Sequence, residues 1–143
     1  MFIGEYHYLI DDKNRLSLPV KFRKDFAKGA VITRGIDSCL TLYPASEWQK
    51  VAERLVSLPT SQSKPRSFAR LMLAGAMDVK VDSQGRIIIP DYLKKYAGLK
   101  KKVVIAGLYN KLEIWDESKW EQDKKKIEAS TPDIAETLGE LGI

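Results

Sequence analysis

Two aspartate–arginine pairs are the residues whose types and spacing point most directly to chemistry. Asp11 precedes Arg15 by four residues, and Asp82 precedes Arg86 by the same four. An arginine guanidinium donates a planar fork of N–H groups that matches a phosphate group or the edge of guanine. A nearby carboxylate can hold that fork in position. The repeated spacing therefore predicts one shared role for the two arginines.

These pairs lie inside a repeated ten-residue segment. The stretch "IDDKNRLSLP", residues 10–19, recurs 71 positions later as "VDSQGRIIIP", residues 81–90. Almost every position exchanges like for like or polar for polar, and Ser17 against Ile88 is the exception. The similarity continues beyond the segment, so that each copy has about 45 residues, and internal duplication has to be read before any other feature.

The residue before each arginine is Asn14 in one copy and Gly85 in the other. These are the two residue types that most readily adopt a positive φ angle. Both copies therefore predict a tight turn between two strands. Pro19 and Pro90 are expected to end the returning strands, because proline cannot donate a ladder hydrogen bond.

Three roles for the Asp–Arg pairs follow from the residues alone. In the first, the aspartates bind turn amides and the arginines merely pair with them, which adds little stability at an exposed site. In the second, the arginines bind phosphate or guanine from a two-stranded ribbon that fits the DNA major groove. The third, catalytic aspartates, is disfavoured because no second acidic residue recurs, no metal-ligand cluster appears and His7 has no counterpart. In the second role the neighbouring polar residues join the arginines as binding residues: Lys13, Asn14 and Gln84.

Each copy has to supply the strands and helices that position these turns. Strands enriched in Tyr, Val and Ile are expected at residues 5–10 and 76–81, followed by the turn, a return strand and a short helix. A second hairpin comes next, and then a helix for which Ser46 or Ser118 is a good N-cap.

The segment between the copies is expected to be helical. Apolar residues recur at i, i+3, i+4 and i+7 from Trp48 to Leu55, and a Ser- and Pro-rich linker at 58–65 precedes a second helix at 66–76. The expected organisation is a first repeat at 4–48, a helical linker at 49–75, a second repeat at 76–120 and a helical or flexible C-terminal tail at 121–143.

A unit of about 45 residues is too small to bury a core alone. Two units in tandem can pack together as a homodimer would, so the duplication predicts a pseudo-dimer with approximate two-fold symmetry. The pattern leaves open whether the strands of the two copies intertwine.

Composition and charge narrow the class of protein. With 143 residues, 44% hydrophobic and 30% charged, the chain has the make-up of an ordinary globular protein. No apolar run approaches the roughly 20 residues of a membrane span, and the start lacks the pattern of a secretory signal. The single cysteine, Cys39, cannot form an internal disulfide and fits a reducing cytoplasm. The net charge of +5 is mild support for a polyanionic partner, and a solvated basic face would give the same value.

The sequence resembles the MraZ family of bacterial regulators over essentially its whole length. The matching features are the "MFIGEY" start, both Asp-x-x-x-Arg motifs with the following proline, "RLMLAGA" before the second copy and "LEIWDESKW" near the end. The resemblance implies an α+β fold in which tandem AbrB-like swapped hairpins form a β-barrel pseudo-dimer flanked by helices.

The resemblance also implies a function. It predicts a sequence-specific regulator of transcription that binds direct repeats in promoter DNA upstream of the division and cell-wall gene cluster, including its own gene, usually as a repressor. It implies a ring-shaped homo-oligomer, typically an octamer, associated with the nucleoid in the cytoplasm. Arg15 and Arg86 would be the principal DNA contacts, with Asp11 and Asp82 as their motif partners.

Several absences and one alternative complete these expectations. We expect no enzymatic activity, no cofactor, no metal, no small-molecule substrate and no membrane association. The alternative function is an oligomeric interaction scaffold whose basic face binds RNA or a protein partner.

Asp12 stands where the second copy has Ser83, so the first copy is expected to bind DNA more weakly unless Asp12 faces away.

Overall fold

Eight short strands and six helices make up the chain, and the structure, a computed structural model, describes residues 1–143. The strands of the first copy are β1 (Phe2–Leu9), β2 (Arg15–Ser17), β3 (Ala30–Arg34) and β4 (Leu40–Pro44). Those of the second copy are β5 (Met77–Val79), β6 (Arg86–Ile88), β7 (Lys102–Tyr109) and β8 (Leu112–Asp116). The helices are η1 (Val20–Phe26), a 3-10 helix, then α1 (Ala45–Val56), α2 (Ser63–Ala74), α3 (Asp91–Ala97), α4 (Glu117–Ala129) and α5 (Thr131–Glu140).

The two copies intertwine, which answers the question left open by the sequence pattern. A six-stranded antiparallel sheet has the order β1-β7-β8-β4-β3-β5, and β2 pairs with β6 in a separate two-stranded sheet. The first strand of each copy therefore pairs with the third strand of the other. Equivalent residues face each other where the copies meet, Leu16 opposite Ile87 and Thr41 opposite Glu113, as expected on a pseudo-two-fold axis.

The predicted tight turn between two strands is present in both copies, but the two strands that it joins do not form an extended hairpin. The chain does turn sharply, but β1 and β2 share only one isolated bridge, between Ile10 and Leu16. β2 instead pairs with β6 along its whole length. A single copy has too little apolar surface for a core, and exchanging strands lets both copies bury theirs together.

The fold is a mixed α+β fold, in agreement with the sequence. In the larger sheet β1 and β5 are the edge strands, so the hydrogen-bonded pairs describe an open sheet, and closure into a barrel stays a prediction.

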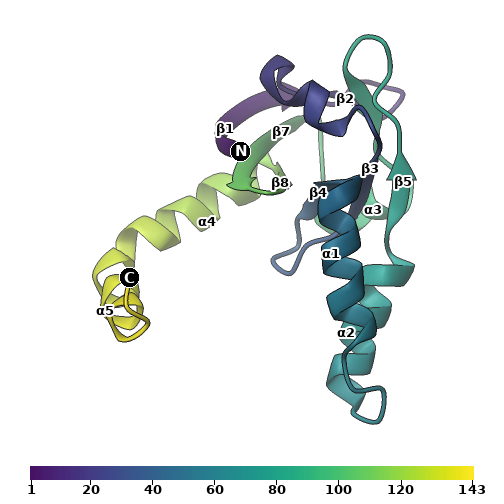
Figure 1. Ribbon diagram of the computed structural model, residues 1–143. Helices are drawn as coiled ribbons and strands as arrows, with labels where there is room; N and C mark the ends of the chain where they lie inside the picture. The colour runs from purple at the N-terminus through teal and green to yellow at the C-terminus, as the bar shows by residue number, and fades with distance from the viewer.

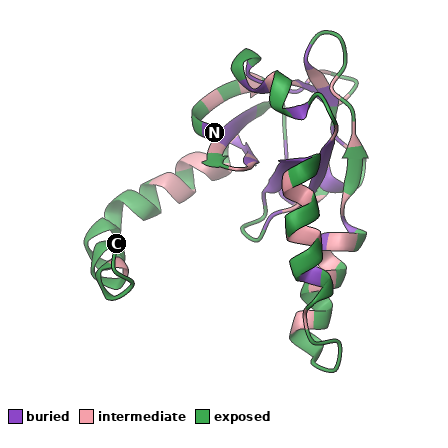
Figure 2. Ribbon diagram, in the orientation of Figure 1, coloured by how far each residue is buried: buried purple, intermediate pink, exposed green.

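The core lies between the two-stranded sheet and the inner face of the larger sheet (Figure 2). Leu16, Leu18, Ile87 and Ile89 are completely buried, while the residues between them are partly or fully exposed. This alternation is the period of two that a half-buried strand requires. It fixes which side chains of β2 and β6 face away from the protein.

The helices differ from the prediction mainly at their ends. α1 and α4 begin at Ala45 and Glu117, so Ser46 and Ser118 are second helical residues and do not cap through their side chains. Pro44 and Asp116, which end strands β4 and β8, take the N-cap positions, since each helix follows its strand without a loop.

Helix α2 begins at Ser63, earlier than expected. α4 and α5 extend away from the sheets (Figure 1), and no helix is both long and apolar enough to cross a membrane.

Candidate nucleic-acid interface

The first Asp–Arg turn is organised by the carboxylate of Asp11. Its Oδ1 atom accepts hydrogen bonds from the backbone N–H groups of Lys13 and Arg15, both at 2.9 Å. Its Oδ2 atom accepts one from Nε of Arg15 at 2.6 Å. Asn14 has a φ angle of +58°, the left-handed conformation predicted for this position. One carboxylate thus shapes the turn and also orients the guanidinium.

The second turn repeats this arrangement. Oδ1 of Asp82 accepts from the backbone N–H groups of Gln84 and Arg86 at 2.9 Å, and Oδ2 accepts from Nε of Arg86 at 2.9 Å. Gly85 has a φ angle of +78°. In both turns the arginine side chain donates only its Nε–H to the aspartate, and its Nη groups make no hydrogen bond within the chain. Each guanidinium therefore keeps donors available for a partner.

These contacts lower the pKa values of both aspartates. The backbone N–H of Arg15 contributes most to lowering the pKa of Asp11, and that of Arg86 does the same for Asp82. A lowered pKa in the folded state stabilises the fold above the unfolded-state pKa, and this stabilisation is lost as the pH falls through the folded-state pKa.

We therefore expect Asp82→Asn to lower the urea midpoint at pH 7, because either orientation of the amide places its NH2 group against a donor, Nε of Arg86 or the backbone N–H groups of Gln84 and Arg86. The difference from the wild type should begin to shrink below about pH 4, where the aspartate of the unfolded chain becomes protonated, and should go on shrinking as the pH falls through the lowered pKa of Asp82 in the folded state. Urea unfolding followed by circular dichroism at pH 7 and pH 3 measures this. An equal difference at both pH values would contradict the assigned hydrogen bonds.

Strand pairing places the two arginines on one surface. In the two-stranded sheet Arg15 is opposite Ile88, and Arg86 is opposite Ser17. Opposite residues of an antiparallel pair point to the same side, away from the buried Leu16. We call this surface the outer ribbon face, formed by Arg15, Ser17, Arg86 and Ile88. Its two arginines are diagonal neighbours, roughly 7–8 Å apart, which is about twice the ~3.4 Å rise of one base pair.

Two basic residues at these turns were missed by the sequence-based prediction. Lys94 on α3 donates from Nζ to Oδ1 of Asn14 at 2.9 Å. Arg23 on η1 packs against Gly85 and donates from Nε to the carbonyl of Leu18 at 2.9 Å. Each turn is thus contacted by a basic side chain of the other copy. The sequence did carry one sign of a shared role, because Arg23 and Lys94 occupy equivalent positions of the two copies, 71 residues apart.

Gly85 is the turn residue that least tolerates a side chain. Its positive φ angle strains any L-residue by about 1–2 kcal/mol, and a Cβ atom there would collide with the side chain of Arg23. We expect Gly85→Ala to lower the free energy of unfolding by at least that amount, and Gly85→Ala with Arg23→Ala to recover only the part due to the collision. Chemical denaturation measures both variants, and wild-type stability of Gly85→Ala would refute this geometry.

The side chains of the other predicted residues lie on the turns and form no hydrogen bond within the chain. Lys13 and Gln84 are exposed, as are Asp12 and Ser83. Asp12 forms no ion pair in the chain, so its negative charge stays at the first turn. Unequal DNA binding by the two copies therefore stays a prediction.

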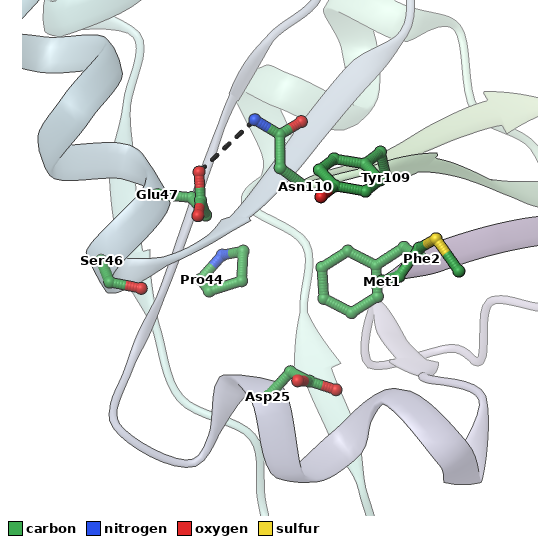
Figure 3. A pocket seen from close by; sticks show the side chains of 8 residues that line it. All are labelled: Met1, Phe2, Asp25, Pro44, Ser46, Glu47, Tyr109 and Asn110. Atoms are coloured by element: carbon green, nitrogen blue, oxygen red, sulfur yellow. Dashed lines mark hydrogen bonds between the residues drawn. The ribbon is translucent and has the colours of Figure 1, made fainter.

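A hollow of about 280 Å³ beside β1 offers no catalytic arrangement. Glu47 accepts a 3.4 Å hydrogen bond from Asn110, and Asp25 lies apart from this pair (Figure 3). Ser46 has no histidine beside it in the lining, which consists of Met1, Phe2, Asp25, Pro44, Ser46, Glu47, Tyr109 and Asn110. Burial raises the pKa of the Cys39 thiol to about 12, so this cysteine is not a nucleophile.

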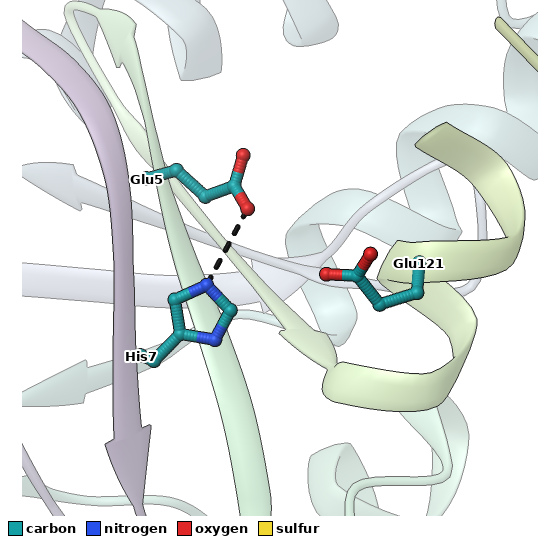
Figure 4. Close-up of side chains that lie close together, drawn as sticks. All are labelled: Glu5, His7 and Glu121. Carbon is teal, nitrogen blue, oxygen red and sulfur yellow. Dashed lines mark ion pairs between the residues drawn. The ribbon is translucent and has the colours of Figure 1, made fainter. Parts of the chain in front are cut away.

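The structure also brings together three side chains of the types that bind metal ions, a cluster that the sequence pattern did not reveal. Glu5, His7 and Glu121 have potential ligand atoms within 4.8 Å of one another (Figure 4). The ring nitrogens of His7 lie 3.4 Å from Glu5 and 3.2 Å from Glu117. These contacts attach the start of α4 to β1. Only Glu5 and His7 are close together in the sequence, because Glu117 and Glu121 lie on α4, far along the chain.

Fold and site together define a class of protein: two intertwined copies of one strand–turn–strand unit, with the arginines that follow the two turns on a common surface. The model of a family described as "MraZ protein, putative antitoxin-like" matches residues 1–71 and again residues 72–140. The chain belongs to the MraZ family.

Three relatives of the chain match it over its full length. It is 43% identical to the transcriptional regulator MraZ of Pediococcus pentosaceus and 41% identical to that of Natranaerobius thermophilus, in each case over 143 residues and all of both chains. The corresponding regulator of Acetivibrio thermocellus is 43% identical over the same length. The chain is therefore a member of a family of transcriptional regulators, and not of an enzyme family.

Proposed function

We propose that this protein regulates transcription by binding a specific DNA sequence through the outer ribbon face. The observation that carries the proposal is the matched presentation of Arg15 and Arg86 on one surface, each oriented through Nε by its aspartate and each with unpaired Nη donors. Such a fork binds O6 and N7 of guanine, and a two-stranded ribbon fits the major groove.

Polar side chains around the arginines would contact the phosphate backbone. Lys13, Gln84, Arg23 and Lys94 surround the two turns, and Asn14 is held between Lys94 and Asp91. Contacts of this kind position a protein on DNA, whereas base contacts carry the sequence information.

Membership of the MraZ family supports a proposal for the target and for the assembly. We propose direct repeats in the promoter of the division and cell-wall gene cluster, including the gene for this protein, with repression as the usual outcome. A ring of subunits, typically eight, would present many outer ribbon faces in the cytoplasm at the nucleoid. Repeated weak contacts then gain affinity through effective concentration. The repeat boundaries 4–48 and 76–120, with the linker and tail, belong to the same proposal.

Binding to the DNA upstream of the protein's own gene tests this function. A gel shift and a fluorescence anisotropy titration should show tighter binding to that duplex than to a scrambled duplex of equal length. The log of the affinity should fall with the log of salt concentration by about 0.9 per phosphate neutralised. Equal affinity for both duplexes would contradict the proposal and favour a scaffold that binds RNA or protein through its basic face.

A further inference from the structure

The outer ribbon face carries one apolar side chain that the duplication does not explain. Ile88 is 60% exposed, although Ile87 and Ile89 beside it on the chain are completely buried. The first copy has Ser17 at the equivalent position, the one exchange of a polar residue for a large apolar one in the ten-residue repeat. Resting on the proposed function, we infer that Ile88 contacts the 5-methyl group of a thymine and thereby gives the DNA site a direction.

Strand register places this contact beside a base-reading arginine. Ile88 lies directly opposite Arg15, and Ser17 lies directly opposite Arg86. Opposite residues have Cβ atoms about 4.5–5.5 Å apart. The bases approached by Arg15 and Ile88 are therefore neighbours in the groove. The outer ribbon face consists of one Arg–Ile pair and one Arg–Ser pair.

The major groove offers a matching chemical difference. Thymine presents a methyl group there, which aliphatic side chains contact, while a serine hydroxyl can only exchange hydrogen bonds with base edges. Two arginines related by a pseudo-two-fold axis would by themselves read two symmetric guanines. The Ile–Ser difference makes the two halves of the site unequal. A site with a direction can be repeated head to tail.

More than half of Ile88 is left uncovered by the rest of the chain. It borders an open hollow of about 360 Å³ whose lining also includes Met77, Asp78, Val79, Lys80 and Pro90. A second copy of the protein is the competing occupant of this apolar surface, and the sedimentation coefficient of Ile88→Ser distinguishes it from DNA.

Deoxyuridine, which lacks the 5-methyl group, is the probe. Each thymine of the bound promoter duplex is replaced in turn, and affinity is measured by fluorescence anisotropy. The wild type should lose about fourfold at one thymine in each site, the effect of one methyl group removed from an apolar contact. Ile88→Ser should bind the parent and substituted duplexes equally, whereas Ile88→Val keeps an apolar contact and should retain the sensitivity.

The exchange variant Ser17→Ile with Ile88→Ser gives the sharpest readout. Its sensitivity to deoxyuridine should move to the opposite half of the site, next to the base read by Arg86. If the wild type binds promoter DNA more tightly than scrambled DNA but no deoxyuridine substitution lowers its affinity, this inference alone is overturned. If the wild type binds promoter and scrambled DNA with equal affinity, the proposed function is overturned. A changed sedimentation coefficient of Ile88→Ser would assign Ile88 to a subunit contact and also overturn the inference.

Discussion

Replacing Arg15 and Arg86 together by alanine is expected to abolish sequence-specific DNA binding and to leave the fold intact. Each bidentate arginine–guanine contact contributes about 1–3 kcal/mol of discrimination, so losing two weakens specific binding by at least about 30-fold. The side chains of Arg15 and Arg86 are 31% and 24% exposed, and their only side-chain partners are the aspartates of their own turns. Far-UV circular dichroism and sedimentation should therefore remain as in the wild type.

A matched control removes the same charge elsewhere. Arg54 on α1 and Arg70 on α2 are exposed, form no side-chain hydrogen bond and lie on helices that point away from the two-stranded sheet (Figure 1). Their double alanine variant should lower affinity for promoter and scrambled duplexes by a similar small factor. If the control variant lost specificity as fully as the Arg15 and Arg86 variant, general charge would explain binding, and the outer ribbon face would not.

The second large effect concerns two adjacent residues of β6. Ile87→Ala is expected to lower the free energy of unfolding by about 2–5 kcal/mol, because Ile87 is completely buried opposite Leu16 at the pseudo-two-fold axis. Ile88→Ala removes the same atoms from a side chain that is 60% exposed, and its stability should stay within about 0.5 kcal/mol of the wild type.

Chemical denaturation of both variants gives the comparison directly. The pair serves as its own control, because the two substitutions are chemically identical and occupy neighbouring positions on one strand. Similar losses of stability would mean that β6 does not separate a buried face from an outer one. Such a result would remove the structural basis for the proposed DNA binding by the outer ribbon face.

Local features of the turns were predictable from the sequence. Asn14 and Gly85 adopt the positive φ angles that their residue types indicate, and each aspartate contacts the arginine four positions later. Both depend on residues within one tight turn, whose geometry a few side chains determine. The family was also predictable, because two motifs at a fixed separation with the same flanking residues are far more specific than one.

The partners of the strands were not predictable, because they lie in the other copy. β2 pairs with β6 about 70 positions away, and no local pattern distinguishes that pairing from a simple hairpin. The contacts of Arg23 and Lys94 with the turns depend on this exchange of strands and were missed for the same reason. Ser46 looked like an N-cap, but its helix continues directly from β4 and leaves the cap position to Pro44.

The most direct test of the proposed DNA binding by the outer ribbon face uses the promoter duplex with its guanines replaced by 7-deazaguanine. This base lacks the N7 acceptor that an arginine fork requires and retains Watson–Crick pairing. Affinities of the wild type and of the Arg15→Ala, Arg86→Ala variant are measured on the normal and substituted duplexes at one salt concentration. We predict a loss of at least tenfold for the wild type and equal, weak binding of both duplexes by the variant. Equal affinity of the wild type for both duplexes would contradict guanine recognition by Arg15 and Arg86.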